Sequence, residues 1–117
     1  MGKLGPHEGM ELELMLKNKK NISLFYSDSE IPDDFIPFLN KKIFKLKTIN
    51  LKDKNKKNFS YYIIYKPSFS IDAKKLEKTL ISSFKNPTIE KERIIGKILG
   101  YKDEDINFYI DRIKKQR

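Results

Sequence analysis

Apolar and polar residues alternate along two neighbouring stretches, residues 43–52 and 59–66. A two-residue period is typical of β-strands, whose successive side chains point to opposite faces. The polar KDKNKKN between the stretches therefore predicts a hairpin turn. In the first stretch the apolar phase shifts from Phe44 and Leu46 to Ile49, and such a shift predicts a β-bulge after residue 48.

Residues 70–115 contain three segments with the helical period of 3.6 residues. Ser70 or Asp72 is expected to cap the first helix and Thr88 the second, which Gly100 ends. The predicted inward positions are Ile71, Leu76, Leu80 and Phe84, then Ile94, Ile95, Ile98 and Leu99, then Ile106, Tyr109, Ile110 and Ile113. The last two helices are predicted to form a packed helical hairpin, because the acidic start of the final helix would repel DNA in a helix-turn-helix.

The first forty residues give three further elements. A helix is predicted from Glu8 to Asn18, although the strict alternation from Met10 to Leu16 also fits a strand. The β-prone segment from Asn21 to Tyr26 predicts a strand. The segment from Asp33 to Asn40 predicts one short helix, since a proline inside it prevents a long one.

These elements predict an α+β fold with a single domain over residues 1–117. It consists of an N-terminal helix, a small three-stranded and mainly antiparallel sheet with a basic β-hairpin, and three C-terminal helices packed on the sheet. The chain has no cysteine, which excludes disulfides and thiolate zinc sites. It has no apolar run near the roughly 20 residues that a membrane span needs. A cytoplasmic protein without a membrane segment is expected.

Positive charge is concentrated in one segment of a chain whose formal net charge is +9. Residues 41–58 carry eight lysines against one aspartate, whereas residues 1–40 carry four lysines against seven acidic residues. The 25 basic residues comprise 22 lysines and three arginines. Arginine is the side chain that suits bidentate contacts to phosphate and guanine, so its scarcity weakens the case for nucleic-acid recognition.

The basic hairpin is the main candidate binding site. Its candidate residues are Lys45, Lys47, Lys52, Lys54, Lys56, Lys57 and Tyr62, with the tyrosine predicted on the same sheet face as the lysines. Lysines here would contact a phosphate backbone, while the tyrosine stacks on a base. They would equally attract an acidic protein partner. Lysines at hairpin tips and edge strands also prevent aggregation between sheet edges, with no ligand involved.

Two other groups of residues suggest metal chemistry. The first is His7, Glu8 and Glu11, with an imidazole and a carboxylate four residues apart; a lone histidine in a Gly/Pro turn is, however, usually exposed and idle. The second is Asp28, Glu30, Asp33 and Asp34, an acidic cluster after a predicted strand, where a hydrolase could hold Mg²⁺. Turn and helix-start positions explain these aspartates equally well, so neither a metal site nor a cofactor is expected.

The sequence therefore predicts a small, non-catalytic binding module that acts through contact with another protein, as an accessory, inhibitor, immunity or adaptor protein does. The alternative is a nucleic-acid-binding protein that uses the hairpin at residues 41–58. A metal-dependent hydrolase that uses the cluster from Asp28 to Asp34 is a more distant alternative. The chain shows no phosphate-binding glycine loop and no nucleophile elbow, and an enzyme is not expected.

Overall fold

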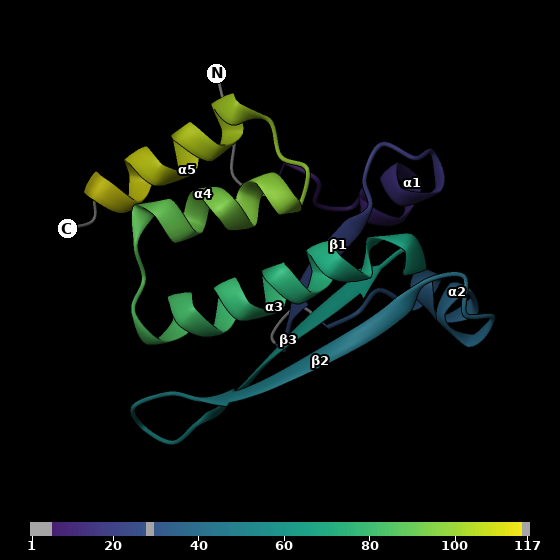
Figure 1. Cartoon of the computed structure of the whole chain (residues 1–117), viewed down its shortest axis with the longest axis horizontal. Helices are drawn as coiled ribbons and strands as arrows, with labels where there is room; N and C mark the ends of the chain where they lie inside the picture. The colour runs from purple at the N-terminus through teal and green to yellow at the C-terminus, as the bar shows by residue number, and fades with distance from the viewer. Residues whose placement is uncertain (1–5, 28–29, 116–117) are drawn as a thin grey trace.

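The computed structural model describes residues 6–27 and 30–115 (Figure 1). The elements are α1 (Glu11–Leu16), β1 (Ile22–Tyr26), η1 (Asp33–Phe35), α2 (Ile36–Asn40), β2 (Lys45–Lys52), β3 (Asn58–Tyr65), η2 (Pro67–Phe69), α3 (Ser70–Lys85), α4 (Ile89–Ile98) and α5 (Asp103–Lys115). The predicted α+β class is confirmed, with an N-terminal helix, a three-stranded antiparallel sheet and three C-terminal helices.

The three strands lie in the order β1-β3-β2, and both pairings are antiparallel. The predicted bulge is wrong, because β2 and β3 pair one to one from Lys45 opposite Tyr65 to Lys52 opposite Asn58. The apolar phase shifts for another reason. Ile49 is buried on one sheet face, whereas Phe44, just before β2, is buried in the cluster on the other face.

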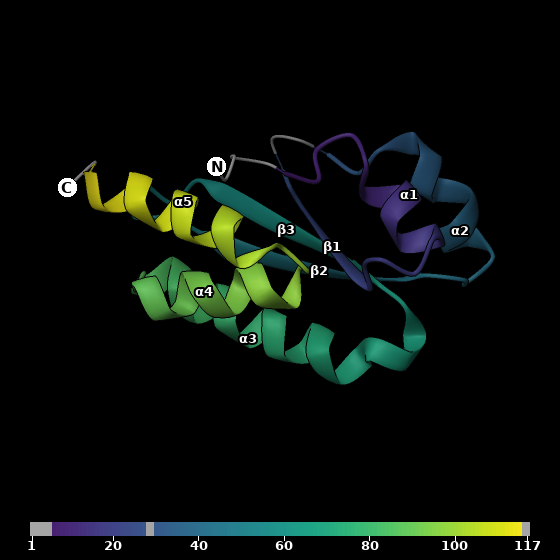
Figure 2. The same cartoon turned by 90° about the horizontal axis from the view of Figure 1, so that it is seen from above.

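The sheet has a hydrophobic cluster on each face. Figure 2 shows α3 and α4 on one side of the sheet and α1 and α2 on the other. The helix-side cluster contains the buried residues Ile22, Leu24, Ile49, Ile63, Tyr65, Ala73, Leu76, Leu80 and Leu99. The opposite cluster contains Met15, Phe25, Phe35, Phe44 and Ile64. Because both faces are partly covered, the sequence shows no single alternation along the strands.

The N-terminal segment is a helix and not a strand, although it is shorter than predicted. α1 begins at Glu11, after a turn in which Gly9 has φ +77°. It ends at Leu16, where Asn18 adopts φ +60° and the Lys19 amide donates to the Leu14 carbonyl at 2.8 Å. Left-handed residues at each end therefore limit the helix to six residues.

The three C-terminal helices follow the predicted spans. Two residues predicted to point inward are exposed, and one predicted helix cap is wrong. Ile71 is 83% exposed, because at 3.6 residues per turn it lies on the opposite side of α3 from Leu80, which faces the sheet together with Ala73 and Leu76. Tyr109 is 43% exposed, as suits a ring with a polar end. Neither of the predicted residues caps α3 with its side chain, and Phe69 holds the cap position.

α4 and α5 form the predicted helical hairpin. The Thr88 hydroxyl caps α4 by accepting from the Lys91 amide at 3.2 Å, and Gly100 ends the helix with φ +83°. A side-chain carbon at Gly96 would lie 2.8 Å from Ile106, so a glycine is needed where the two helices meet. No helix within the described ranges is long and apolar enough to cross a membrane.

Candidate functional site

The lysine-rich segment forms the tip of the β2–β3 hairpin, as predicted. The Asp53 carboxylate accepts the Asn55 and Lys57 amides at 2.8 and 2.9 Å. The Asp53 amide donates to the Lys57 carbonyl at 3.0 Å, and Lys56 adopts φ +62°. The only acidic residue of the segment therefore folds the loop, while the lysines of the tip, Lys52, Lys54, Lys56 and Lys57, are exposed.

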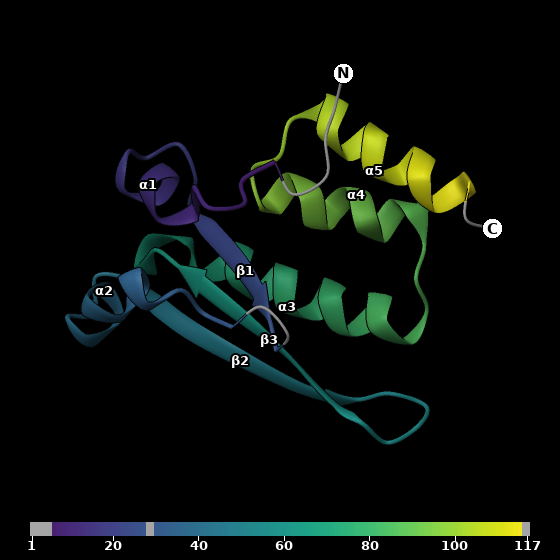
Figure 3. The same cartoon turned by 180° about the vertical axis from the view of Figure 1, so that it is seen from behind.

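Side-chain contacts hold the hairpin against α3. The rings of Phe59 and Phe84 stack with their centroids 5.8 Å apart. Farther along β2, Lys47 forms an ion pair with Glu77 of α3 at 3.5 Å. Figures 1 and 3 show the tip beside the C-terminal half of α3. The tip is thus presented at a fixed place on the molecule.

The pairing register divides the predicted site between the two sheet faces. Lys47 lies opposite Ile63 and points to the α3 side, as does Lys45. Tyr62 lies opposite Thr48 on the other face, where it packs half-buried against the second cluster. The prediction that the tyrosine shares a face with these lysines is therefore wrong, because neighbouring strand positions alternate between faces. Only Lys52 among the strand lysines points to the tyrosine's side.

Lysines of α3 extend the positive surface beyond the hairpin. Lys74, Lys78 and Lys85 are exposed and, at spacings of four and seven residues, lie along one line of the helix. Glu77, which pairs with Lys47, places the neighbouring flank of α3 next to β2. We call these lysines the basic band; it consists of Lys45, Lys47, Lys54, Lys56, Lys57, Lys74, Lys78 and Lys85, together with Lys52, which adjoins the tip but points to the other sheet face. The helical spacing was visible in the sequence, but the proximity of α3 to β2 was not.

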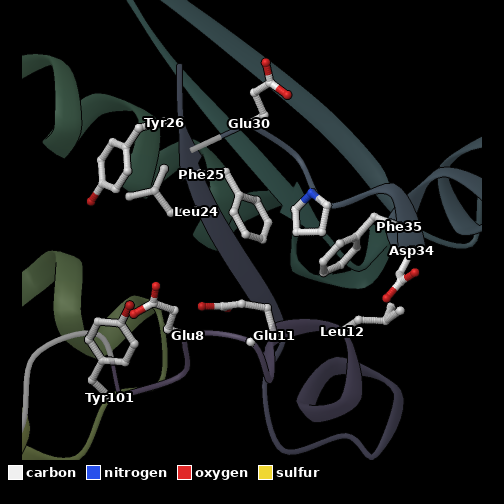
Figure 4. A pocket seen from close by; sticks show the side chains of 12 residues that line it. Glu8, Glu11, Leu12, Leu24, Phe25, Tyr26, Glu30, Asp34, Phe35 and Tyr101 are labelled. Atoms are coloured by element: carbon white, nitrogen blue, oxygen red, sulfur yellow. The ribbon is translucent and has the colours of Figure 1, made fainter. Parts of the chain in front are cut away.

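A cavity of about 480 Å³ lies near α1 and β1 (Figure 4). Its lining consists of Glu8, Gly9, Glu11, Leu12, Leu24, Phe25, Tyr26, Glu30, Pro32, Asp34, Phe35 and Tyr101. Four of these residues carry carboxylates, two carry phenols, and none carries a basic group. The cavity is therefore acidic and partly aromatic in a chain whose net charge is strongly positive.

A buried lysine lies behind the cavity. The side chain of Lys20 is fully buried, and its ammonium donates to the Leu99 carbonyl at 2.6 Å and to Glu11 Oε1 at 3.1 Å. It also lies 2.8 Å from His7 Nδ1 and 5.0 Å from the centre of the Tyr101 ring. Burial lowers the pKa of Lys20, and the Glu11 carboxylate opposes this shift. The lysine thus joins α1, β1 and the α4–α5 turn.

The expectation that His7 is exposed and idle is wrong. His7 is half-buried, and its ring meets that of Tyr101 edge to face with centroids 4.6 Å apart. Sequence reasoning missed both this contact and Lys20. Nothing in the run KNKKN distinguishes Lys20 from the exposed Lys17 and Lys19, and its partner Leu99 is far away along the chain.

The described members of the two candidate metal groups do not come together as a metal site. Of the first, Glu11 is held by Lys20. Of the second, Asp28 lies outside the described residues, and Glu30 and Asp34 line the cavity. The described part of the chain contains no group of three or more histidine or acidic side chains placed to hold a metal ion.

Four tyrosines with raised pKa values predict that the stability of the fold depends on pH. Burial raises the pKa values of Tyr26, Tyr61, Tyr101 and Tyr109, that of Tyr101 to about 12. The folded state therefore keeps phenol protons that the unfolded chain loses near pH 10. Stability is fully present below pH 10 and should fall as the pH rises from 10 to about 12.

This prediction is checked by urea unfolding at a series of alkaline pH values, with the tyrosinate absorbance followed in parallel. Tyr101→Phe removes one of the titrating groups and should make the loss of stability less steep. The lowered pKa of Lys20 acts in the opposite direction just below pH 10.5, so Lys20 does not explain a loss. Tyrosines that all titrate near pH 10 in the folded protein would contradict the prediction.

Comparisons of the chain with protein-family models, with curated proteins and with solved structures find no match. The proposals below are therefore argued from the chain's own residues and their geometry.

Proposed function

We propose that this protein is a non-catalytic binding module that docks on an acidic surface of a protein partner through the basic band. The observation that carries the proposal is the placement of the hairpin. Its exposed lysine tip is folded by Asp53 and held beside α3 by Phe59 and Phe84. A preformed charged surface binds without the ordering cost that a flexible tail would incur.

The band has a large excess of positive charge. Its nine lysines face two carboxylates, Asp53 in the tip and Glu77, which pairs with Lys47. Exposed lysines at the rim of an interface act mainly by steering the partner, which raises the association rate constant and makes it depend on salt. The band therefore supports a partner with a complementary acidic patch.

Nucleic-acid binding is the second candidate, and the same lysines favour it. The geometry supports contacts to a phosphate backbone more than stacking on bases. Phe59 and Tyr61 point to the helix side, where Phe59 stacks on Phe84 and Tyr61 packs against the cluster. Tyr62 is half-buried on the other face. Without an exposed ring beside the lysines, the affinity for single strands would lack its stacking contribution. A protein partner accordingly remains our first choice.

The test replaces Lys52, Lys54, Lys56 and Lys57 by glutamine. We expect little change in stability, within about 0.5 kcal/mol for each surface substitution. The association rate constant for a poly-glutamate probe should fall roughly tenfold at low salt. Stopped-flow fluorescence at two salt concentrations measures it.

The matched control removes the same charge elsewhere, by replacing the exposed Lys19, Lys41, Lys102 and Lys114 with glutamine. It should bind the probe almost as the wild type does. Equal losses in the two variants would contradict the proposal, since net charge alone would then account for binding. Tight, salt-sensitive binding of random-sequence duplex DNA or RNA that only the tip variant loses would favour the nucleic-acid candidate instead.

A further inference from the structure

We infer that the cavity near α1 and β1 is a binding site for an organic cation with an apolar body, such as an alkylammonium or arylammonium group. The site is separate from the basic band. It prefers a positively charged ligand, whereas the lysines of the band prefer a negatively charged one. A volume of about 480 Å³ suits a small molecule or one long side chain.

The apolar part of the site is rigid. Phe35 is almost completely buried and meets the ring of Phe25 edge to face, with centroids 5.5 Å apart. Leu24 and Phe25 belong to β1, whose backbone is paired with β3. Figure 4 shows Phe25, Phe35 and Leu12 on one side of the cavity and Tyr26 and Tyr101 on the other. These walls suit a hydrocarbon or aromatic body.

The polar part of the site is anionic. Glu8, Glu11, Glu30 and Asp34 line the cavity. Lys20 balances the charge of Glu11, and the other three carboxylates favour a positive group there. An anionic ligand would meet only like charges among the lining residues.

Glu11 is set to receive the ligand. Its Oε1 accepts from Ser23 Oγ at 2.9 Å and from Lys20 Nζ at 3.1 Å. Among the described residues no hydrogen bond or ion pair reaches Oε2, and Figure 4 shows the carboxylate directed into the cavity. Two fixed contacts on one oxygen thus orient the carboxylate and leave the other oxygen for an N–H donor of the ligand.

A bare divalent ion fits this site less well than an amine. Ca²⁺ and Mg²⁺ need several oxygen ligands close together, and the side chains of the described residues form no such group. The apolar walls would also contribute nothing to a bare ion. A free amine and the side chain of a lysine in a peptide share the required chemistry, so the experiment includes both.

The experiment titrates the folded protein with phenethylamine and, separately, with N-acetyl-lysine methylamide, following amide shifts by NMR. Phenethyl alcohol, which is uncharged, and phenylpropionate, which is anionic, are the ligand controls. We expect saturable shifts at Leu24, Phe25 and Phe35 with a dissociation constant of about 1 mM or lower. Binding of the alcohol should be roughly tenfold weaker, because it lacks the charge.

The variant is Glu8→Gln with Asp34→Asn, which lowers the negative charge and leaves Glu11 and Lys20 in place. It should weaken amine binding at least about fivefold. The matched control, Asp33→Asn with Glu90→Gln, alters two exposed acidic residues outside the cavity and should bind as the wild type does. If the variant does not fold, the inference is still tested by comparing phenethylamine with phenethyl alcohol and phenylpropionate on the wild-type protein.

Binding of either amine with these preferences supports the inference, and the tighter of the two identifies the source of the cation. The inference is overturned if neither amine shifts the lining residues at about ten times the expected dissociation constant. It is equally overturned if phenethyl alcohol or phenylpropionate binds as tightly as phenethylamine. Neither result depends on the lysines of the basic band.

Discussion

Replacing Lys20 by methionine should lower the free energy of unfolding by about 3–5 kcal/mol. The substitution keeps much of the side-chain volume but removes the cation that faces Glu11, whose side chain is only 12% exposed. It also leaves the Leu99 carbonyl without its 2.6 Å donor. A buried carboxylate without a partner is far more costly than the loss of a surface ion pair. Urea unfolding followed by circular dichroism at neutral pH measures the change.

Two controls separate burial from charge. Lys19→Met alters the exposed neighbour and should change stability by no more than about 0.5 kcal/mol. Adding Glu11→Gln to Lys20→Met removes the stranded charge and should recover part of the loss, so that the two substitutions are not additive. If Lys20→Met unfolds at the same urea concentration as Lys19→Met, the ammonium is not held as described.

Phe35→Ala should lower the free energy of unfolding by about 3–5 kcal/mol. Phe35 is 1% exposed and lies between Phe25 and Phe44, with ring centroids 5.5 and 6.3 Å away. Removing the ring leaves a cavity in the smaller of the two clusters, which few residues can fill by relaxing. Thermal and urea unfolding both report the loss.

Its neighbour Ile36 is the matched control, because it is 44% exposed and its truncation should have only a small effect. Hydrogen exchange adds a local measurement. Protection should fall in Phe35→Ala first around α1 and α2, which flank the opposite cluster, and less in α3, which packs on the other face. Equal destabilisation by Phe35→Ala and Ile36→Ala would show that the two faces are wrongly assigned.

The local pattern was sufficient for most of the secondary structure but not for all of the faces. The helix cap at Thr88 and the helix end at Gly100 depend on neighbouring residues alone and were predicted correctly. Ile71 is predicted inward, yet it lies nine residues before Leu80 and therefore on the opposite side of α3, where it is 83% exposed. The phase shift predicts a bulge only if all apolar residues face one side, whereas Phe44 is buried on one sheet face and Ile49 on the other.

The site was less predictable because it depends on contacts between distant segments. The lysines of the hairpin could be named from composition, but the register that separates Tyr62 from Lys45 and Lys47 requires the partner strand. The cavity brings together residues of α1, β1, the segment before α2 and the α4–α5 turn. Its anchor, Glu11, is oriented by Lys20, which no motif distinguished from its neighbours.

The strand order β1-β3-β2 has a consequence for synthesis on the ribosome. Among the described residues β1 pairs only with β3. The partner residues of β3 are translated 35 to 43 positions later, about 2 to 9 s at ordinary elongation rates. During this interval the apolar segment from Ile22 to Phe25 has no partner strand, which is the condition in which nascent chains associate with one another. Lys17, Lys19 and Lys20 directly precede it, and charges beside an apolar strand act as gatekeepers against such association. We therefore expect Lys20, which is later buried behind the cavity, to protect the nascent strand before the chain has folded.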